Sequence, residues 1–537
     1  MSMTHHKVID AIVVGAGFAG MYTLYKMLGA GFSARVFEAG ENVGGTWYWN
    51  RYPGARCDIE SMEYSYSFDD DLQQKWNWSE RYATQPELLK YANHVAENFN
   101  LRPHISFNTR VVSARYDEDA SVWQVTTDQG EEISARFCVM ATGCLSSVNQ
   151  PDFEGIASFK GNTYHTGQWP HKGVDFTGRR VGIIGTGSSS IQSIPLIAEQ
   201  AKQLTVFQRT ANFSVPAHNQ DLDERYIEEI KSEYGTFREE NRQMHGGFGA
   251  RRPRHEDSIW DADAETIQRR LEERWALGGL GFTGAFADLG LSVDANNIAA
   301  EFIREKIRAT VTDPLVAELL CPSGIVGCKR VCVDTNYYAT YNRDNVTLVD
   351  VSQHPIDLLT DKGIVTNDVE YEFDDIIFAT GFDAMTGTLL KIDIRGKGGL
   401  TLQEKWHAGP RTYLGLSTYG FPNLFTISGP GSPSVLSNMI LTIEQHVNWI
   451  LECLVYMRTQ QIASIEANLD AEDAWVKQGN EFANMTLMPM CNSWYLGANV
   501  PGKPRVFMPF VGGIPLYFET CARVAANNYE GFTLNAG

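Results

Sequence analysis

Two glycine-rich turns, each placed between an apolar strand and a helix, constrain the fold of this chain more than any other feature. The first turn follows the apolar run 9–14 and reads Gly15-Ala16-Gly17-Phe18-Ala19-Gly20. The second follows the run 180–184 and reads Gly185-Thr186-Gly187-Ser188-Ser189-Ser190. Glycines in such turns let the backbone approach a pyrophosphate, and the helix that follows offers free N–H groups at its N-terminus. The sequence therefore predicts an α/β protein with two Rossmann-like dinucleotide-binding domains.

The residue that ends the next strand distinguishes the two sites. In the first site, the strand 34–37 is followed by Glu38, whose carboxylate can accept hydrogen bonds from the hydroxyls of a ribose. In the second site, the equivalent position is Gln208, followed by Arg209 and Thr210. A carboxylate there would repel a 2′-phosphate, whereas arginine offers it a planar fork of donors. We expect FAD at the first site and NADP, in preference to NAD, at the second. A solvated charge at a strand end is the alternative interpretation of Arg209.

The order of the strands predicts that one domain interrupts the other. Two apolar strands close in Ala-Thr-Gly, at Gly143 and at Gly381, and the second glycine turn lies between them. A chain of 537 residues also exceeds a single ordinary core. We expect an FAD domain at 1–144 and 383–537 and an NADP domain at 145–216 and 326–382, with a mostly helical insertion at 217–325. Charge-rich segments with helical spacing at 224–240 and 261–275 favour solvated helices in that insertion.

Charge and cysteine usage exclude several classes of function. The formal charge of −20 makes binding to nucleic acid or an anionic membrane surface unfavourable, and no apolar stretch approaches the length of a membrane span. The N-terminus leaves no room for a signal peptide, so we expect a cytoplasmic protein. No C-x-x-C pair or metal-ligand spacing is present, which argues against a metal site and against a disulfide reductase. We expect free thiols, most of them buried, at all nine cysteines: Cys57, Cys138, Cys144, Cys321, Cys328, Cys332, Cys453, Cys491 and Cys521.

Two further stretches carry a family resemblance. The segment 159–170 fits the fingerprint F-x-G-x-x-x-H-x-x-x-W-P at every fixed position, and 45–58 fits G-x-W-x-x-x-x-Y-P-G-x-x-x-D. With these motifs the chain resembles the Baeyer–Villiger monooxygenases over essentially its whole length, and within them the phenylacetone, steroid and cyclic-ketone branch. The related flavin N-monooxygenases usually differ at the position of Trp169 and lack the second signature.

The resemblance implies roles for particular residues. Arg330 is the implied catalytic arginine, and Asp58 orients it and partly balances its charge. Lys329 joins Arg209 and Thr210 around the 2′-phosphate of NADP, and a structural role is implied for His165. Further implied cofactor contacts are Gly45, Thr46, Trp47, Tyr64 and, on a loop that covers the nicotinamide, Trp494.

Each of these roles has a plainer alternative. Lys329 and Arg330 could be an ordinary solvated basic pair, and Trp494 a buried core residue. The loop 429–439 resembles the substrate-facing loop of the phenylacetone and steroid monooxygenase branch more than that of the cyclohexanone branch. Ordinary helix packing competes with a ketone pocket for its three apolar candidates, Val435, Leu436 and Met439.

The implied function is an NADPH- and O2-dependent monooxygenase that converts a ketone to an ester or lactone. NADPH would reduce FAD, the reduced flavin would capture O2 as a C4a-peroxyflavin, and Arg330 would stabilise the anions that follow, because an arginine keeps its proton. Oxygenation of nitrogen or sulfur is the alternative reaction, and a flavin-binding redox sensor without turnover is the alternative outside enzymes. The partner is a small-molecule ketone whose identity the sequence leaves open. The oligomeric state also stays open, with a monomer as one alternative.

Overall fold

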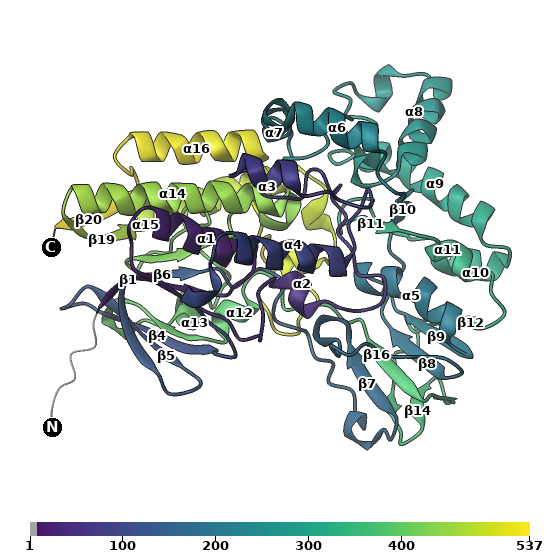
Figure 1. Ribbon diagram of the computed structural model, residues 1–537. Helices are drawn as coiled ribbons and strands as arrows, with labels where there is room; N and C mark the ends of the chain where they lie inside the picture. Colours follow the sequence, from purple (N-terminus) through teal and green to yellow (C-terminus); the bar gives the residue numbers. More distant parts are fainter. Residues whose placement is uncertain (1–7, 537) are drawn as a thin grey trace.

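The computed structural model describes residues 8–536 and contains two large sheets side by side, of which the first is mixed and the second wholly parallel (Figure 1). The first sheet has eight strands in the order β17-β4-β5-β6-β1-β2-β3, with β18 paired to β6 as well. Its strands are β1 (Ile9–Val14), β2 (Ala34–Phe37), β3 (Ile105–Ser106), β4 (Val111–Asp117), β5 (Val122–Thr127), β6 (Glu132–Met140), β17 (Asp393–Arg395) and β18 (Leu424–Thr426). The predicted strand 34–37 is confirmed.

Both ends of the chain build this first sheet. β18 pairs in parallel with β6, so that Phe425 lies opposite Val139, and β17 pairs in parallel with β4. Residues from the last third of the chain thus complete a sheet that the first third begins. This return is the discontinuous arrangement that the two Ala-Thr-Gly strands indicate, although the domain boundaries given above stay a prediction.

Long helices cover one face of the first sheet. α1 (Phe18–Gly29), α14 (Met439–Thr459) and α16 (Ile514–Ala526) run across it in Figure 1. Inward side chains such as Met21, Leu24 and Ile450 are at most 1% exposed, as expected for helices that bury an apolar stripe. Further helices in this part are α2 (Thr46–Trp49), α3 (Asp70–Lys75), α4 (Gln85–Asn98), α12 (Gly387–Leu390), α13 (Leu402–Lys405) and α15 (Leu469–Asn484).

The second sheet is a smaller, wholly parallel sheet with the order β12-β9-β8-β16-β7. Its strands are β7 (Asn162–His165), β8 (Arg180–Ile184), β9 (Gln203–Gln208), β12 (Val346–Asp350) and β16 (Asp375–Phe378). The central side chains Ile183, Val206 and Ile377 are fully buried, as in parallel sheets that are covered on both faces. α5 (Ser188–Gln200) and α11 (Tyr337–Thr340) lie on one face, and the strands β13 (Leu358–Leu359), β14 (Gly363–Thr366) and β15 (Val369–Glu372) form a separate small sheet.

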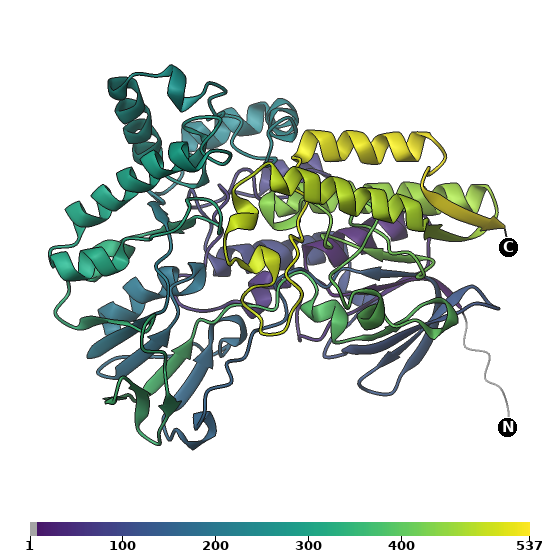
Figure 2. The ribbon, with the colours of Figure 1, turned by 180° about the vertical axis from the view of Figure 1, so that it is seen from behind.

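A helical unit projects from the second sheet, seen from behind in Figure 2. A parallel pair of short strands, β10 (Ser214–Pro216) and β11 (Cys332–Asp334), closes its base. Its helices are α6 (Glu224–Ser232), α7 (Tyr234–Arg242), α8 (Ala264–Leu277), α9 (Val293–Thr310) and α10 (Pro314–Leu320). The expected helical character of 217–325 is confirmed. One buried side chain, Arg238, donates from α7 to Ser65 Oγ at 2.6 Å, and so ties this unit to the segment between α2 and α3.

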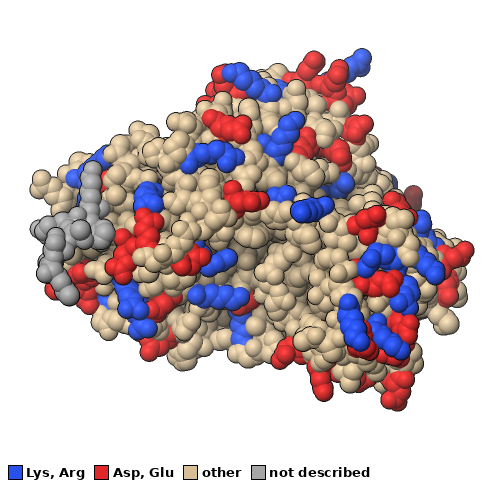
Figure 3. Space-filling view, turned by 60° about the horizontal axis from the view of Figure 1, so that its bottom comes forward, with Lys and Arg blue, Asp and Glu red and all other residues tan. Residues whose placement is uncertain are grey.

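Charges of both signs alternate around the rim of the face shown in Figure 3. The middle of that face is mostly uncharged, so the net acidity does not gather into one patch there. Within residues 8–536, no helix is long and apolar enough to cross a membrane.

Candidate active site

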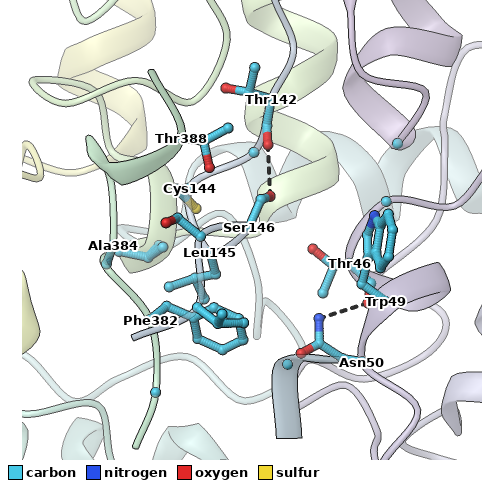
Figure 4. Close-up of a pocket in the computed structure, with 18 of the residues that line it drawn as sticks. Thr46, Trp49, Asn50, Thr142, Cys144, Leu145, Ser146, Phe382, Ala384 and Thr388 are labelled. Atoms are coloured by element: carbon cyan, nitrogen blue, oxygen red, sulfur yellow. Dashed lines mark hydrogen bonds between the residues drawn. The ribbon is translucent and has the colours of Figure 1, made fainter. Parts of the chain in front are cut away.

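One large cavity lies where the carboxyl ends of both sheets meet. Its volume is about 960 Å³, and its walls come from the two glycine turns, the Ala-Thr-Gly strand ends and the segment 427–443. Ligands of open α/β sheets bind at this edge. Figure 4 shows residues of and next to α2 on one side of the cavity, facing residues that follow β6 and β16: Thr46, Trp49 and Asn50 against Cys144, Leu145 and Phe382.

The first glycine turn leaves no room for side chains. Gly15 has φ 103°, and a Cβ there would lie 2.6 Å from the carbonyl oxygen of Ala141. A Cβ on Gly20 would lie 1.8 Å from the oxygen of Gly15, and one on Gly17 would lie 3.3 Å from Cα of Gly45. The first turn of α1 has no side-chain cap, so its N–H groups remain available to a phosphate. This cradle fits the pyrophosphate of a dinucleotide.

Glu38 is held rigidly at the end of β2. Its Oε2 accepts a hydrogen bond from the N–H of Ala16 at 2.7 Å, and its Oε1 accepts one from the N–H of Gly40 at 2.8 Å. Burial raises the pKa of Glu38, and these backbone donors act in the opposite direction. Each carboxylate oxygen keeps a lone pair for a further donor. The side chain therefore fits the ribose diol of FAD, as the sequence predicts.

The second glycine turn repeats the first. Gly185 has φ 111°, and a Cβ there would lie 2.6 Å from the carbonyl oxygen of Ala379. Thr186 is buried and donates from Oγ1 to the oxygen of Thr210 at 2.9 Å. The side chain of Asn212, which sequence reasoning missed, donates to the oxygen of Thr186 at 2.6 Å. The predicted residues of this site that line the cavity are Gly187, Ser188, Ser189, Arg209 and Thr210.

Two cations meet beside the second turn. Arg209 and Lys329 both line the cavity, and neither makes an ion pair with a carboxylate of residues 8–536. Burial lowers the pKa of the Lys329 ammonium, and the charge of Arg209 lowers it further. Two like charges with no acidic partner are stabilised by an anion between them. Their position fits the 2′-phosphate of NADP.

Arg330 and Asp58 form a bidentate pair inside the cavity. Arg330 Nε donates to Asp58 Oδ2 at 2.6 Å, and its Nη2 donates to Oδ1 at 2.7 Å. Its Nη1 donates to the carbonyl oxygen of Val435 at 2.6 Å. Burial lowers the pKa of Arg330 and the Asp58 charge raises it, with a net rise. Of the five N–H groups of a guanidinium, two remain for a ligand.

Some of the predicted site residues line the cavity and others lie behind its wall. The side chains that line the cavity next to Arg330 include Val435 and Met439. Leu436 is not among the lining residues; it packs against the apolar cluster to which Val435, Met385 and Met508 belong. Gly20, Gly185 and Thr186 also lie behind the wall, where they shape the turns without facing the cavity.

A covering loop lies next to Arg330. The short helix η9 (Trp494–Leu496) places Trp494, half-exposed, in the cavity wall, so Trp494 is not the buried core residue of the alternative interpretation. Tyr495 is 2% exposed, and it lies close enough to Arg330 for the guanidinium charge to act on its hydroxyl. Burial raises the pKa of Tyr495 to about 12, and the charge of Arg330 opposes that rise. Tyr495 was missed from the sequence, where its place beside Trp494 was the only signal.

The prediction that all cysteines are free is wrong for two of them. Cys328 and Cys491 form a disulfide with their Cα atoms 6.0 Å apart, across a sequence separation of 163 residues. That separation hides the contact from any search for closely spaced pairs. The other seven are free, and all but Cys321 are buried. The bridge joins the residue before Lys329 to the loop that carries Trp494.

The fingerprint segment 159–170 takes part in the packing of the second sheet. His165 Nδ1 accepts the N–H of Gly167 at 3.0 Å, and its Nε2 lies 3.2 Å from Thr380 Oγ1. Burial lowers the pKa of His165. Trp169 is 3% exposed and packs with Tyr164. These contacts favour the structural role over a catalytic one.

Two dinucleotide cradles that open into one cavity, with a fixed guanidinium between them, define a flavoprotein oxidoreductase that uses a nicotinamide cofactor. The family model described as flavin-binding monooxygenase-like matches residues 7–221. A Baeyer–Villiger monooxygenase of Pseudooceanicola batsensis is 43% identical, over 98% of this chain and 95% of the relative. The phenazine N-monooxygenase PhzNO1 of Lysobacter antibioticus is 40% identical, over 98% and 97%. The solved structure of an oxidised steroid monooxygenase bound to NADP is 52% identical, with a TM-score of 0.95 over 99% of this chain and 100% of that one. The chain belongs to the Baeyer–Villiger monooxygenases.

Proposed function

We propose that this chain is an FAD-containing, NADPH- and O2-dependent enzyme that converts ketones to esters or lactones. The observation that carries the proposal is Arg330, which is fixed by Asp58 in the wall of the cavity shared by both nucleotide cradles. The family relationship supports the same reaction. FAD fits the first cradle and NADP(H) fits the second, on the donors and acceptors described above.

The cofactors supply the hydride and the activation of oxygen, and the chain supplies position and charge. The first glycine turn and Glu38 hold one dinucleotide, while Arg209, Thr210 and Lys329 hold the phosphate of the other. Gly45, Thr46, Trp47 and Tyr64 line the flavin side of the same wall. Trp47 donates from Nε1 to the Tyr64 hydroxyl at 3.4 Å, so the two rings hold each other in place.

Arg330 stabilises negative charge that develops on the reacting oxygens. A guanidinium cannot give up its proton, so it stabilises an anion without neutralising it. Asp58 fixes the orientation of the guanidinium before the reaction, which is the condition for an electrostatic contribution to the rate. The Val435 oxygen holds the third nitrogen, so the apolar substrate wall and the cation move as one unit.

The substrate class is a ketone with an apolar body, either cyclic, aryl or steroid-like. Val435, Met439 and Ile443 supply apolar wall on the side of Arg330. A mostly apolar pocket with few polar groups is the usual form of a small-molecule site. The proposed partner is this small molecule and not a nucleic acid. We also propose the domain boundaries given above, and a cytoplasmic location, for which the seven free cysteines are the support.

Oxygenation of nitrogen is the second candidate, favoured by the relative described as a phenazine N-monooxygenase. An amine lone pair attacks an electrophilic oxygen directly, so no anionic carbonyl adduct forms and Arg330 has no charge to stabilise. The Arg330–Asp58 pair therefore favours the ketone reaction.

The test is incubation of the purified enzyme with NADPH, air and a substrate panel, followed by mass spectrometry. The panel contains cyclohexanone, phenylacetone, a macrocyclic ketone, a 20-keto steroid and a phenazine. We expect an ester or lactone one oxygen heavier than its ketone. A phenazine N-oxide without any ester would replace the proposal by the second candidate, and NADPH oxidation that yields only hydrogen peroxide would contradict both.

A further inference from the structure

A buried hydroxyl without a partner stands in the wall of the cavity. Ser428 is 3% exposed and lines the cavity, and its Oγ has no hydrogen-bond partner among residues 8–536. Buried polar side chains nearly always have a partner, so a missing one calls for an explanation. Its backbone is also unusual, because φ is 56°, in the left-handed region that non-glycine residues rarely adopt. Both features occur at a single residue in the wall of a ligand site.

The position of Ser428 in the first sheet indicates which part of FAD it faces. β2 ends in Glu38 at the ribose position, and the neighbouring β1 ends in the turn that fits the pyrophosphate. The next strand is β6, and β18 pairs with its carboxyl end, where Thr426 lies opposite Met140. Ser428 directly follows β18. Across the edge of the sheet, the order is therefore ribose, pyrophosphate, β6 and then Ser428, so this residue lies toward the flavin half of the dinucleotide.

A chain of buried hydrogen bonds sets the backbone of Ser428. Its N–H donates to Nδ1 of His446 on α14 at 3.0 Å. The hydroxyl of Tyr517 on α16 donates to the oxygen of Leu414 at 2.6 Å, and it also lies 2.8 Å from His446 Nε2. Since that hydroxyl has only one hydrogen, Nε2 must carry the hydrogen of the second bond. The donors and acceptors are thus satisfied by one tautomer of the imidazole.

His446 stays neutral within this chain. It is 0% exposed, and burial lowers its pKa to about 3. A charged imidazole would place a second hydrogen on Nδ1, directly against the N–H of Ser428. The neutral tautomer therefore fixes the direction in which residue 428 leaves the strand. The Ser428 side chain, with nothing of its own to bond, is left for a ligand.

We propose that Ser428 is a flavin-binding residue, whose hydroxyl hydrogen-bonds the ribityl or isoalloxazine part of FAD, and that His446 is its positioning residue. The inference rests on the proposed binding of FAD at the first site and extends it to the flavin half. Tyr517 fixes the tautomer of His446, so α14 and α16 both take part in holding the cofactor wall.

The first experiment compares two serines of the same loop. Ser428→Ala removes the hydroxyl without a partner, whereas Ser432→Ala removes a fully buried hydroxyl that already donates to the oxygen of Gly429 at 2.7 Å. FAD is removed and then titrated back, with flavin fluorescence and the visible absorption band as readouts. We expect Ser428→Ala to raise the Kd for FAD about 3- to 10-fold, the range for one lost hydrogen bond. Ser432→Ala should stay within about twofold of the wild type, because its hydroxyl bonds to the protein.

The absorption band distinguishes the two parts of the flavin half. A shifted band together with a raised Kd indicates a bond to the isoalloxazine, and a raised Kd with an unchanged band indicates the ribityl chain. Equal Kd values for Ser428→Ala and the wild type overturn the inference. A wild-type apoprotein that binds no FAD overturns the proposed function instead, so the two failures are distinct.

The second experiment tests whether His446 acts through Ser428. His446→Leu removes the acceptor, and His446→Asn keeps an oxygen near the place of Nδ1. We expect His446→Leu to raise the Kd for FAD about as much as Ser428→Ala and to add nothing in the Ser428→Ala background, because the two changes break one interaction. His446→Asn should restore most of the affinity. Additive effects in the double variant overturn the positioning role. Should His446→Leu not fold, His446→Asn and Tyr517→Phe carry the same cycle with Ser428→Ala.

Discussion

The two glycine turns have nearly the same backbone hydrogen bonds, but different segments pack around them. Gly15 donates its N–H to the oxygen of Phe37 at 2.8 Å, and Gly185 donates to that of Phe207 at 3.0 Å. The carbonyl oxygen of the residue after this glycine has a different hydrogen-bond donor in each turn. In the first turn, the Ala16 oxygen accepts from the backbone of Gly44, which brings α2 onto the turn; in the second, the Thr186 oxygen accepts from the side chain of Asn212.

This difference decides how tightly each dinucleotide is enclosed. Gly17 lies against Gly45, whereas a Cβ on Gly187 would meet nothing within 4 Å. Glu38 is buried, whereas Arg209 and Thr210 are exposed. The same local motif is thus enclosed by a second segment in the first site and left open in the second. An enclosed site suits a cofactor that stays bound, and an open site suits one that exchanges. We expect FAD to remain bound through purification and NADP(H) to exchange.

The largest expected effects come from filling the glycine turns themselves. In Gly15→Ala, the new methyl group meets a backbone oxygen at 2.6 Å that cannot move without shifting β6, so we expect FAD to be lost. The matched change Gly185→Ala meets Ala379 at the same distance, and it should spare FAD while abolishing NADPH-driven flavin reduction. Flavin content and reduction rate measure the two effects. Loss of FAD from both variants would show that the sites are not independent.

Removal of the guanidinium between the sites should separate the two half-reactions. We expect Arg330→Ala to keep NADPH-driven flavin reduction and to lower ester formation at least ~10²-fold, as for loss of one preorganised charge. Stopped-flow reduction and product analysis measure the two steps. Asp58→Asn, which keeps the shape but not the charge, should fall between this variant and the wild type. Equal losses in both steps would contradict the assigned role.

The sequence predicts local features better than distant contacts. The strand–turn–helix units, Glu38 and Arg209 follow from adjacent residues, and all lie where expected. Arg330 and Asp58 are 272 residues apart, and only the family resemblance indicated that they meet. Ser428 and His446 gave no signal, because a left-handed backbone and a hydroxyl without a partner arise only when α14 packs against β18. The Cys328–Cys491 bridge was missed for the same reason, since the loops that carry it come together only in the folded chain.

The open second site should show its preference through Arg209. We expect Arg209→Ala to raise the KM for NADPH about tenfold, a discounted value for a charged contact at an exposed position. The KM for NADH should change by less than about twofold, because NADH has no 2′-phosphate for the arginine to bind. Steady-state kinetics with both cofactors measure the ratio. An equal rise in the KM for NADH would contradict the phosphate-binding role of Arg209 and favour an ordinary surface charge.

The smallest expected effect concerns the bridge that ties the covering loop to Lys329 and Arg330. Cys491→Ser, or treatment of the wild type with dithiothreitol, should lower Tm by about 2–4 °C, the range for one native disulfide in a chain of this size. FAD content should not change, because the bridge borders only the second site. Cys321→Ser is the control, since Cys321 is free and half-buried and its loss should leave the response to dithiothreitol intact. A Cys491→Ser variant that still loses stability with dithiothreitol would place the sensitive bond elsewhere. A loss of FAD would show that the covering loop holds the enclosed site as well as the open one.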